Sequence, residues 1–381
     1  MASLPWIILS MVLSGVSGAV GSGQEAQPPT DSLGSLKREV DDAKAAFNRA
    51  YGLEPEPRVE TLWRAYLSKA EKNSLKGLEA LESDPKSPEA FAFLDWIVTE
   101  QLNIDEALRE RAIGLLLERH ATNPKVGRLC TVLGYYGDAS HQPTLELLRE
   151  VSDKNPDRTA RGQACLGLAR LTWNKARMLD FQHEENPEPY HHEAERLFEM
   201  VVDDYGDCPD LRKIGVRRAR ETLGESAGDE LFEMRMLTVG KTAPEIGGED
   251  LDGRPLKLSD YRGKVVLLTF WASWCGPCMA MVPQERALAE RMKNRPFALV
   301  GINGDEERDV ARRTAESREM SWRSFWNGGP NGPITDQWNV QGWPTIYVLD
   351  RDGVIRFKQV HEKKLDDAVE LLVEEAETRH K

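Results

Sequence analysis

Three short, unbroken apolar runs lie in the last third of the chain, at residues 265–270, 297–302 and 345–350. A continuous apolar run of this length is typical of a strand that is buried on both faces of a mostly parallel sheet. Segments with helical spacing lie between and after these runs, at residues 276–293, 305–318 and 363–378. An Asp352-Gly353 turn joins the third run to residues 354–358 as an antiparallel hairpin. This order of strands and helices predicts a compact α/β domain.

The chain before this domain shows a different pattern, with apolar side chains at helical spacing and almost no strand-like alternation. Helices are predicted over residues 36–51, 59–81, 88–100, 104–120, 143–151, 159–179, 191–205 and 211–223. Turn signals such as Asn123-Pro124 and Asn155-Pro156 separate them. Two of the segments resemble stacked helical hairpins, but the strict period of a tetratricopeptide array is missing. A helical array and a plain helical bundle therefore both stay open.

A chain of 381 residues is long enough for two or three domains. We predict a multidomain protein of the α plus α/β class, with an all-helical N-terminal domain over residues 36–236 and a C-terminal domain over residues 237–381. The formal net charge of −13 argues against a nucleic-acid partner, because phosphate binding needs a basic surface.

Residues 5–20 are mostly apolar and end in small side chains, which is typical of a secretory signal peptide. The usual basic start is missing, because no Lys or Arg precedes Lys37. We predict a signal peptide over residues 1–22, a flexible linker over residues 23–35, and an exported protein of the periplasm or cell envelope. An uncleaved membrane anchor and a disordered tail are the alternatives. Contact with a membrane is expected only if the segment is not cleaved.

Two of the five cysteines, Cys275 and Cys278, lie where the first buried strand passes into a helix. Cys275 falls at the N-terminus of that helix, where unpaired backbone N–H groups and the helix dipole stabilise a thiolate. We therefore expect Cys275 to be the nucleophile. Cys278 lies one turn further in, is expected to be more buried, and is placed to attack a mixed disulfide on Cys275. Pro277 suits the first helical turn, because the N–H that it lacks had no partner there.

The other cysteines do not suggest a disulfide scaffold, because five is an odd and sparse number for this length. Cys165 is predicted to be a small buried apolar residue. A structural zinc site needs four ligands, and the C-terminal domain holds neither a second Cys-x-x-Cys nor a His pair. We predict a site without metal or cofactor, and an ordinary structural disulfide is the remaining alternative. Residues 271–274 lack the Thr and Pro of a peroxidatic site, which argues against peroxidase chemistry.

The motif around the two cysteines resembles the active-site signature of thioredoxins, Phe270-Trp271-Ala272-Ser273-Trp274-Cys275-Gly276-Pro277-Cys278. Residues 240–244 (Gly-Lys-Thr-Ala-Pro) and 258–266 (Leu-Ser-Asp-Tyr-Arg-Gly-Lys-Val-Val) resemble the TlpA/ResA-like branch of the redoxin superfamily. Members of that branch are exported thiol–disulfide oxidoreductases. The resemblance covers residues 237–381 and leaves out the helical region. It implies a thioredoxin fold and thiol–disulfide exchange with protein substrates.

A second motif, Gly342-Trp343-Pro344-Thr345, precedes the third buried strand. A Pro that opens a central strand is unusual, since it cannot donate to the ladder. The resemblance implies that the Trp343–Pro344 bond is cis and that Pro344 faces the cysteines across the substrate groove; an ordinary turn proline is the alternative. The residues predicted to bind substrate are Trp274, Gly276, Pro277, Trp343 and Pro344.

Two positions depart from the family pattern. Thr269 stands where thioredoxins have a buried acid, and Met281 stands where the cytochrome-maturation relatives have a Glu. Both acids accept a proton from the buried thiol in the families that have them, so no general base for Cys278 is evident. Glu285 is close in the sequence and could substitute, but we expect a surface role for it.

Two further features of the C-terminal domain have structural interpretations. Pro283 lies inside the predicted active-site helix and matches the family's helix-kinking proline. Trp322, Trp326 and Trp338 could line an apolar groove for a partner, although we favour packing in the core and in loops.

The sequence as a whole predicts a thiol–disulfide oxidoreductase in which Cys275 attacks and Cys278 resolves. Its expected partners are protein thiols and disulfides and an unidentified redox donor or acceptor. The alternative is a non-catalytic helical scaffold that uses its redoxin domain as a protein-binding module. The helical domain is expected to bind a partner or to position the redox domain.

Overall fold

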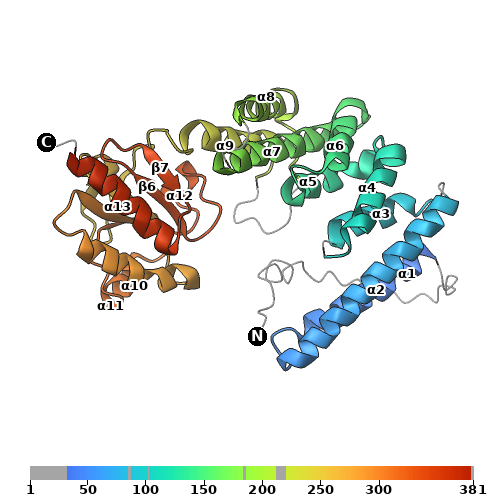
Figure 1. Ribbon diagram of the computed structural model, residues 1–381, viewed down its shortest axis with the longest axis horizontal. Helices are drawn as coiled ribbons and strands as arrows, with labels where there is room; N and C mark the ends of the chain where they lie inside the picture. The colour runs from blue at the N-terminus through green and yellow to red at the C-terminus, as the bar shows by residue number, and fades with distance from the viewer. Residues whose placement is uncertain (1–31, 85–86, 102, 183–185, 212–219, 379–381) are drawn as a thin grey trace. The chain divides into compact units, whose positions relative to one another are not determined.

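The computed structural model describes residues 32–84, 87–101, 103–182, 186–211 and 220–378. Within them the chain forms two compact units, one that ends at Ala227 and one that begins at Gly228. The first unit is helical and the second holds a five-stranded sheet covered by helices, which confirms the predicted fold class (Figure 1). The predicted signal peptide, residues 1–22, lies outside the described residues.

The first helix, α1 (Leu33–Ala50), begins inside the predicted linker of residues 23–35. Ser32 is its N-cap, and the Ser32 hydroxyl oxygen accepts a hydrogen bond from the backbone N–H of Ser35 at 3.2 Å. A Ser followed by apolar residues at helical spacing is a helix start signal. This corrects the end of the linker from residue 35 to residue 32, and the part of the linker up to residue 31 lies outside the described residues.

The helical unit continues with a series of further helices. These are α2 (Glu56–Ser83), α3 (Ala90–Glu100), α4 (Glu106–His120), α5 (Gly127–Tyr136), α6 (Gln142–Lys154), α7 (Arg158–Gln182) and α8 (Glu188–Tyr205), with a short 3-10 helix (Pro124–Val126) before α5. The next helix, α9 (Leu223–Met236), begins in this unit, and its residues from Gly228 onward belong to the second unit. No helix was predicted from the sequence at the position of α5. The helix predicted over residues 211–223 falls largely outside the described residues. Its described residues before Leu223 are not helical, and Leu223 instead starts α9.

Helices one or two positions apart along the chain pack against each other, such as α5 against α7 and α7 against α8. This is the contact pattern of a helical array rather than of one closed bundle. Where α5 meets α7, a Cβ atom on Gly134 would lie 2.4 Å from the Cα of Gly167, so the two glycines let the helix backbones touch. Glycine lowers helix propensity, so the glycines of α5 explain why this helix was not predicted from the sequence.

The second unit holds two sheets and the helices that cover the larger one. Its elements are β1 (Gly247–Glu249), β2 (Pro255–Lys257), a 3-10 helix (Leu258–Tyr261), β3 (Val265–Trp271), α10 (Gly276–Arg291), β4 (Phe297–Asn303), α11 (Arg308–Ser317), β5 (Ser324–Trp326), α12 (Pro333–Gln337), β6 (Thr345–Leu349), β7 (Ile355–Lys358) and α13 (Glu362–Thr378). The small sheet is the hairpin of β1 and β2, and the large sheet has the strand order β5-β4-β3-β6-β7.

The large sheet is mixed. Strands β3, β4 and β5 run parallel to one another, whereas β6 is antiparallel to both β3 and β7. The three predicted apolar runs are therefore the three central strands, but the third runs opposite to the other two. A run that is buried on both faces does not reveal its direction, because direction depends on the route of the chain between strands.

Strand β3 is buried along its whole length and separates two halves of the core. Its side chains at 266, 268 and 270 pack in one cluster with Trp338 and Tyr347. The alternate side chains of Val265 and Leu267 pack in another cluster with Leu288 of α10 and with residues of β4, β6 and α13. Because side chains alternate along a strand, Thr269 also lies on the face that α10 covers.

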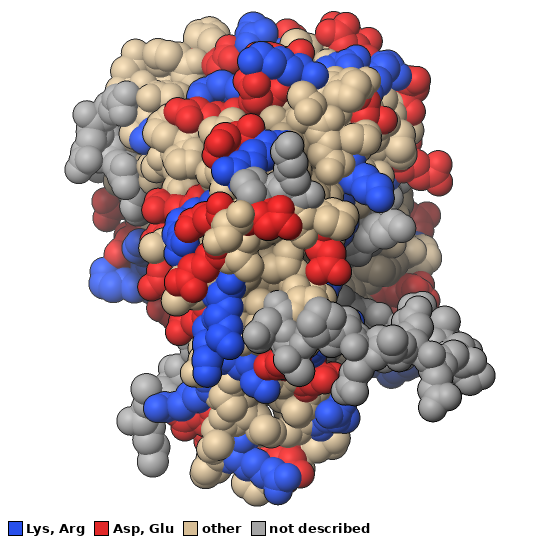
Figure 2. All heavy atoms as spheres, turned by 90° about the vertical axis from the view of Figure 1, so that its right-hand side faces the viewer, with Lys and Arg blue, Asp and Glu red and all other residues tan. Residues whose placement is uncertain are grey.

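None of the described helices is long and apolar enough to cross a membrane. On the face shown in Figure 2, acidic and basic side chains are interspersed rather than gathered into one basic area.

Candidate active site

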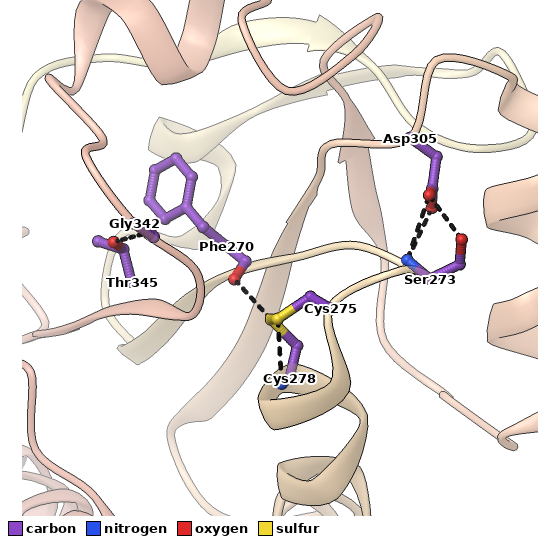
Figure 3. Close-up of a disulfide and its surroundings, with 7 residues drawn as sticks. All are labelled: Phe270, Ser273, Cys275, Cys278, Asp305, Gly342 and Thr345. Atoms are coloured by element: carbon purple, nitrogen blue, oxygen red, sulfur yellow. Dashed lines mark hydrogen bonds between the residues drawn. A yellow bond between two sulfur atoms is a disulfide. The ribbon is translucent and has the colours of Figure 1, made fainter. Parts of the chain in front are cut away.

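The two cysteines lie at the point where β3 gives way to α10 (Figure 3). Cys275 is the N-cap of α10, and its Sγ accepts a hydrogen bond from the backbone N–H of Cys278 at 3.1 Å. A disulfide joins the two residues, whose Cα atoms are 5.3 Å apart. Pro277 occupies the first turn, where its missing N–H leaves no helical bond unmade. Cys275 therefore lies at the positive end of the helix dipole, as expected.

The two sulfur-bearing residues differ little in exposure. Cys275 is 5% exposed and Cys278 is 3% exposed. Cys278 is therefore only slightly more buried than Cys275, although a larger difference was expected. Neighbouring residues cover them: Trp271 and Ala272 of the preceding strand and loop, and Ala311 of α11, belong to the same apolar cluster. The Sγ of Cys278 lies 4.0 Å from the carbonyl oxygen of Phe270. Little of either sulfur-bearing residue is therefore open to solvent in the disulfide form.

A buried carboxylate fixes the loop in front of Cys275. Asp305, after the end of β4, accepts hydrogen bonds from the backbone N–H of Ser273 at 3.1 Å and from its hydroxyl at 2.7 Å (Figure 3). The side-chain amide of Asn303 donates to the same carboxylate at 2.7 Å. Asp305 is 3% exposed. These bonds tie the loop that carries Trp274 and Cys275 to the neighbouring strand.

Sequence reasoning missed this role of Asp305, which it placed at the start of a helix. One signal could have revealed it. Asn303 is the last residue of β4, a buried strand that runs parallel to β3, and Asp305 follows two residues later, so both lie at the carboxyl edge of the sheet with the cysteine motif.

Two tryptophans meet beside the disulfide. Trp274 is 54% exposed, and its ring packs edge-on against that of Trp343 with the ring centroids 5.6 Å apart. Trp343 also packs on the apolar cluster that contains both cysteines. The chain leaves room for this ring at Gly304, where a Cβ atom would lie 2.4 Å from Trp343.

The remaining residues predicted to bind substrate lie next to these groups in the chain. The Trp343–Pro344 peptide bond is cis, as the resemblance implied. Pro344 is half-buried, whereas Gly276 and Pro277 are exposed at the start of α10. Just after Pro344, the Thr345 hydroxyl donates to the carbonyl oxygen of Gly342 at 2.8 Å, which closes the turn before β6 (Figure 3).

The structure corrects the expected surface role of Glu285. This residue is 3% exposed, because it lies on the inner face of α10 with Cys278, Val282 and Leu288. Burial raises the pKa of Glu285 to about 7, and a hydrogen bond from the Thr269 hydroxyl partly opposes that rise. Pro283 lies inside the same helix, as predicted.

Other predicted features of the chain are structural. Trp338 is 1% exposed and belongs to the core, which supports packing over a partner groove at that position. Cys165 is fully buried, as predicted, and burial raises the pKa of its thiol to about 12. Cys130 and Cys208 are also buried and form no disulfide. Among the described residues, no group of acidic, His and Cys side chains is arranged to hold a metal ion.

Comparison with known proteins places the similarity in the C-terminal unit. The family model named Redoxin matches residues 238–372. The thiol-disulfide oxidoreductase ResA of Bacillus thuringiensis is 28% identical over 119 residues, which is 31% of this chain and 68% of that protein. The thiol:disulfide interchange protein DsbE of Vibrio cholerae is 32% identical over 146 residues, which is 37% of this chain and 76% of that protein.

A solved structure also aligns with this unit. The thioredoxin domain of a thiol-disulfide oxidoreductase from Bacteroides vulgatus has 26% sequence identity and a TM-score of 0.34, covering 36% of this chain and 98% of that one.

Proposed function

The chain belongs, through its C-terminal domain, to the redoxin family of thiol–disulfide oxidoreductases, and on this premise we propose that Cys275 and Cys278 exchange electrons with thiols and disulfides of other proteins. The observation that carries the proposal is the disulfide at the N-terminus of α10, with Cys275 as the cap of the helix. A helix N-terminus stabilises the thiolate that attacks. No cofactor is part of the proposal, since the electrons reside in the sulfur pair.

The exchange proceeds in two displacements. In the reduced protein, the Cys275 thiolate attacks a substrate disulfide, forms a mixed disulfide and expels one substrate sulfur as a thiolate. Cys278 then loses its proton and attacks the Sγ of Cys275, which breaks the mixed disulfide and releases the second substrate sulfur. The substrate gains two electrons and the chain closes its own disulfide. A dithiol donor restores the reduced pair, and the same steps in reverse oxidise a substrate dithiol.

The surface beside the pair is proposed to bind the substrate chain. The rings of exposed Trp274 and half-buried Trp343 are in edge-to-face contact, and Pro344 follows Trp343 through the cis bond. Gly276 and Pro277 directly follow Cys275, are exposed, and offer backbone surface without bulky side chains. Aromatic surface with little side-chain freedom suits recognition of an extended peptide.

The burial of both sulfurs supports a second candidate function. With 5% exposure at Cys275 and 3% at Cys278, the domain could serve as a protein-binding module whose disulfide is only structural. In that case the helical domain would be a scaffold and no disulfide would turn over.

We propose in addition that the protein is exported to the periplasm or cell envelope. The apolar residues 5–20 support this proposal, since they have the pattern of a signal peptide. The helical domain is proposed to bind a partner or to position the redox domain. Fractionation of cells that produce the full chain, followed by N-terminal sequencing, tests export; retention of the intact chain in the cytoplasm would refute it.

Trapping of a mixed disulfide tests the catalytic proposal. The Cys278→Ser variant keeps the attacking thiol but cannot resolve, so it should accumulate a covalent complex with insulin that reductant releases. Cys165→Ala, which removes a buried cysteine of the other unit, should behave like the wild type and form no lasting complex. Failure of Cys278→Ser to trap insulin, with no turnover by the wild type, would support the binding module instead.

A further inference from the structure

The resolving thiol lies in surroundings that oppose its ionisation. Cys278 is 3% exposed and is packed among apolar residues of β3 and α11. Removing charge from water is costly, so a buried thiol gives up its proton less readily than one in solvent. Resolution therefore needs a group close by that takes the proton.

Glu285 lies on the same face of the same helix. It follows Cys278 by seven residues, which is two turns, and both side chains are buried on the inner side of α10. Helical side chains lean toward the N-terminus, so the Glu285 carboxyl group is displaced from its own Cα toward the turn that carries Cys278.

Thr269 ties that carboxyl group to the strand beneath the cysteines. The Thr269 hydroxyl hydrogen-bonds to the Glu285 carboxylate. Thr269 directly precedes Phe270, whose carbonyl oxygen lies 4.0 Å from the Sγ of Cys278. The carboxyl group therefore lies one residue along β3 from the backbone that contacts the resolving sulfur.

We propose that Glu285 is the proton acceptor for Cys278 in the resolving step. This inference rests on the proposed oxidoreductase function. In the step, the Cys278 proton passes to the Glu285 carboxylate through the Thr269 hydroxyl or a water, and the Cys278 thiolate attacks the Sγ of Cys275. The bond between Cys275 and the substrate sulfur breaks, and the departing substrate thiolate takes a proton from Glu285 or from solvent. Protons and electrons balance without a further reagent.

The charge surroundings of Glu285 suit this role. The core cluster beside it draws apolar side chains from β3, β4, β6 and α13. The polar side chains of α13 that reach toward α10 lie at its rim, where Asp366 contacts Gln284 and Arg291. Arg286 pairs with Glu319 at the surface. Asp305, the other buried carboxylate of the site, is bound to Ser273 and Asn303.

The pKa of Glu285 suits a group that accepts a proton near neutral pH. Burial brings the pKa of Glu285 to about 7. A general base works best when its pKa is near the working pH, since it is then partly ionised and still basic.

A single-turnover reaction of the full chain tests the inference. The reduced protein is mixed with an equimolar aromatic disulfide whose thiolate product absorbs visible light. The first product thiolate reports attack by Cys275, and the second reports resolution by Cys278. Glu285→Gln should slow the second phase at pH 7 by roughly a hundredfold and leave the first phase unchanged. The wild-type second phase should rise through pH 7, and the variant should lose this rise.

Glu290→Gln is the matched control, because Glu290 is an exposed acid on the same helix. It should leave both phases as in the wild type. If the wild type released no first product thiolate, the proposed oxidoreductase function would be contradicted, and this inference with it. Two normal phases in the wild type together with an unaltered second phase in Glu285→Gln would overturn the role of Glu285 alone.

A measurement on the wild type covers the case in which Glu285→Gln does not fold. Carbon-13 NMR of the labelled glutamate carboxyl groups gives the titration midpoint of Glu285 in the disulfide and dithiol forms. Coupling to the Cys278 proton should move the midpoint between the two forms, because interacting groups titrate together. An identical midpoint in both forms would overturn the proposal.

Discussion

The carboxylate of Asp305 holds both the backbone N–H and the hydroxyl of Ser273, two residues before Cys275. This links the end of β4 to the loop that presents the attacking sulfur. Hydrogen bonds from Ser273 and Asn303 to a carboxyl group that is 3% exposed therefore hold this loop, in addition to apolar packing.

Replacing Asp305 should loosen this loop. Asp305→Ala leaves the buried donors of Ser273 and Asn303 without their partner, which should lower the local stability by about 2–3 kcal/mol. Hydrogen exchange of peptides that cover residues 271–279 measures the effect as faster exchange. Asp309→Ala removes an exposed acid from α11 and should leave exchange unchanged. Unchanged exchange in Asp305→Ala would show that packing alone holds the loop.

The buried acid should make stability depend on pH. The folded pKa of Glu285, about 7, lies above its ordinary value of 4.5, so the folded state binds more protons between these values. The wild type should therefore lose stability as pH rises from 4.5 to 7, by about 3 kcal/mol in total.

Thermal unfolding at several pH values checks this dependence. Relative to Glu285→Gln, the wild type should become less stable as pH rises through this range, and the difference should be constant below pH 4.5 and above pH 7. Glu290→Gln should follow the wild type at every pH. A difference between the wild type and Glu285→Gln that does not vary with pH would mean that Glu285 ionises as it does in water.

The exposed tryptophan should matter for protein substrates and not for small ones. Trp274 is 54% exposed and contacts Trp343, so Trp274→Ala removes an aromatic ring from the proposed substrate-binding surface and removes little core packing. The KM for a protein disulfide should rise about tenfold, which corresponds to about 1.4 kcal/mol of binding. Reduction of a small aromatic disulfide should keep its rate. Trp274→Phe keeps an aromatic ring and should retain most of the binding; equal losses on both substrates would argue against this surface.

Much of the redox domain was predictable from local pattern. The three apolar runs, the cysteine pair at a helix start and the cis proline at 344 each depend on a few neighbouring residues and were found. Strand β5 was not predicted, since Ser324–Trp326 is short and exists through its pairing with β4. The direction of β6 was likewise hidden, because pairing with β3 decides it.

The site itself shows where sequence reasoning stops. Glu285 stands between Gln284 and Arg286, which reads as a polar surface segment, yet its spacing of seven from Cys278 puts it on the buried face. Asp305 reads as a helix start, whereas its partners come from a loop far away in the chain. Both errors concern charged residues whose burial is set by tertiary contacts rather than by local propensity.

The central claim is that Cys275 and Cys278 form a reversible redox couple. We would equilibrate the full chain in glutathione or dithiothreitol buffers of graded potential and alkylate the free thiols. The masses of the products then give the ratio of disulfide to dithiol. The account predicts one two-electron transition, in which the ratio of disulfide to dithiol changes tenfold for every 30 mV, approximately. A midpoint near roughly −270 mV would indicate a reductase, and one between roughly −180 and −120 mV an isomerase or oxidase. A pair that stays closed, or stays open, at every potential would contradict the account.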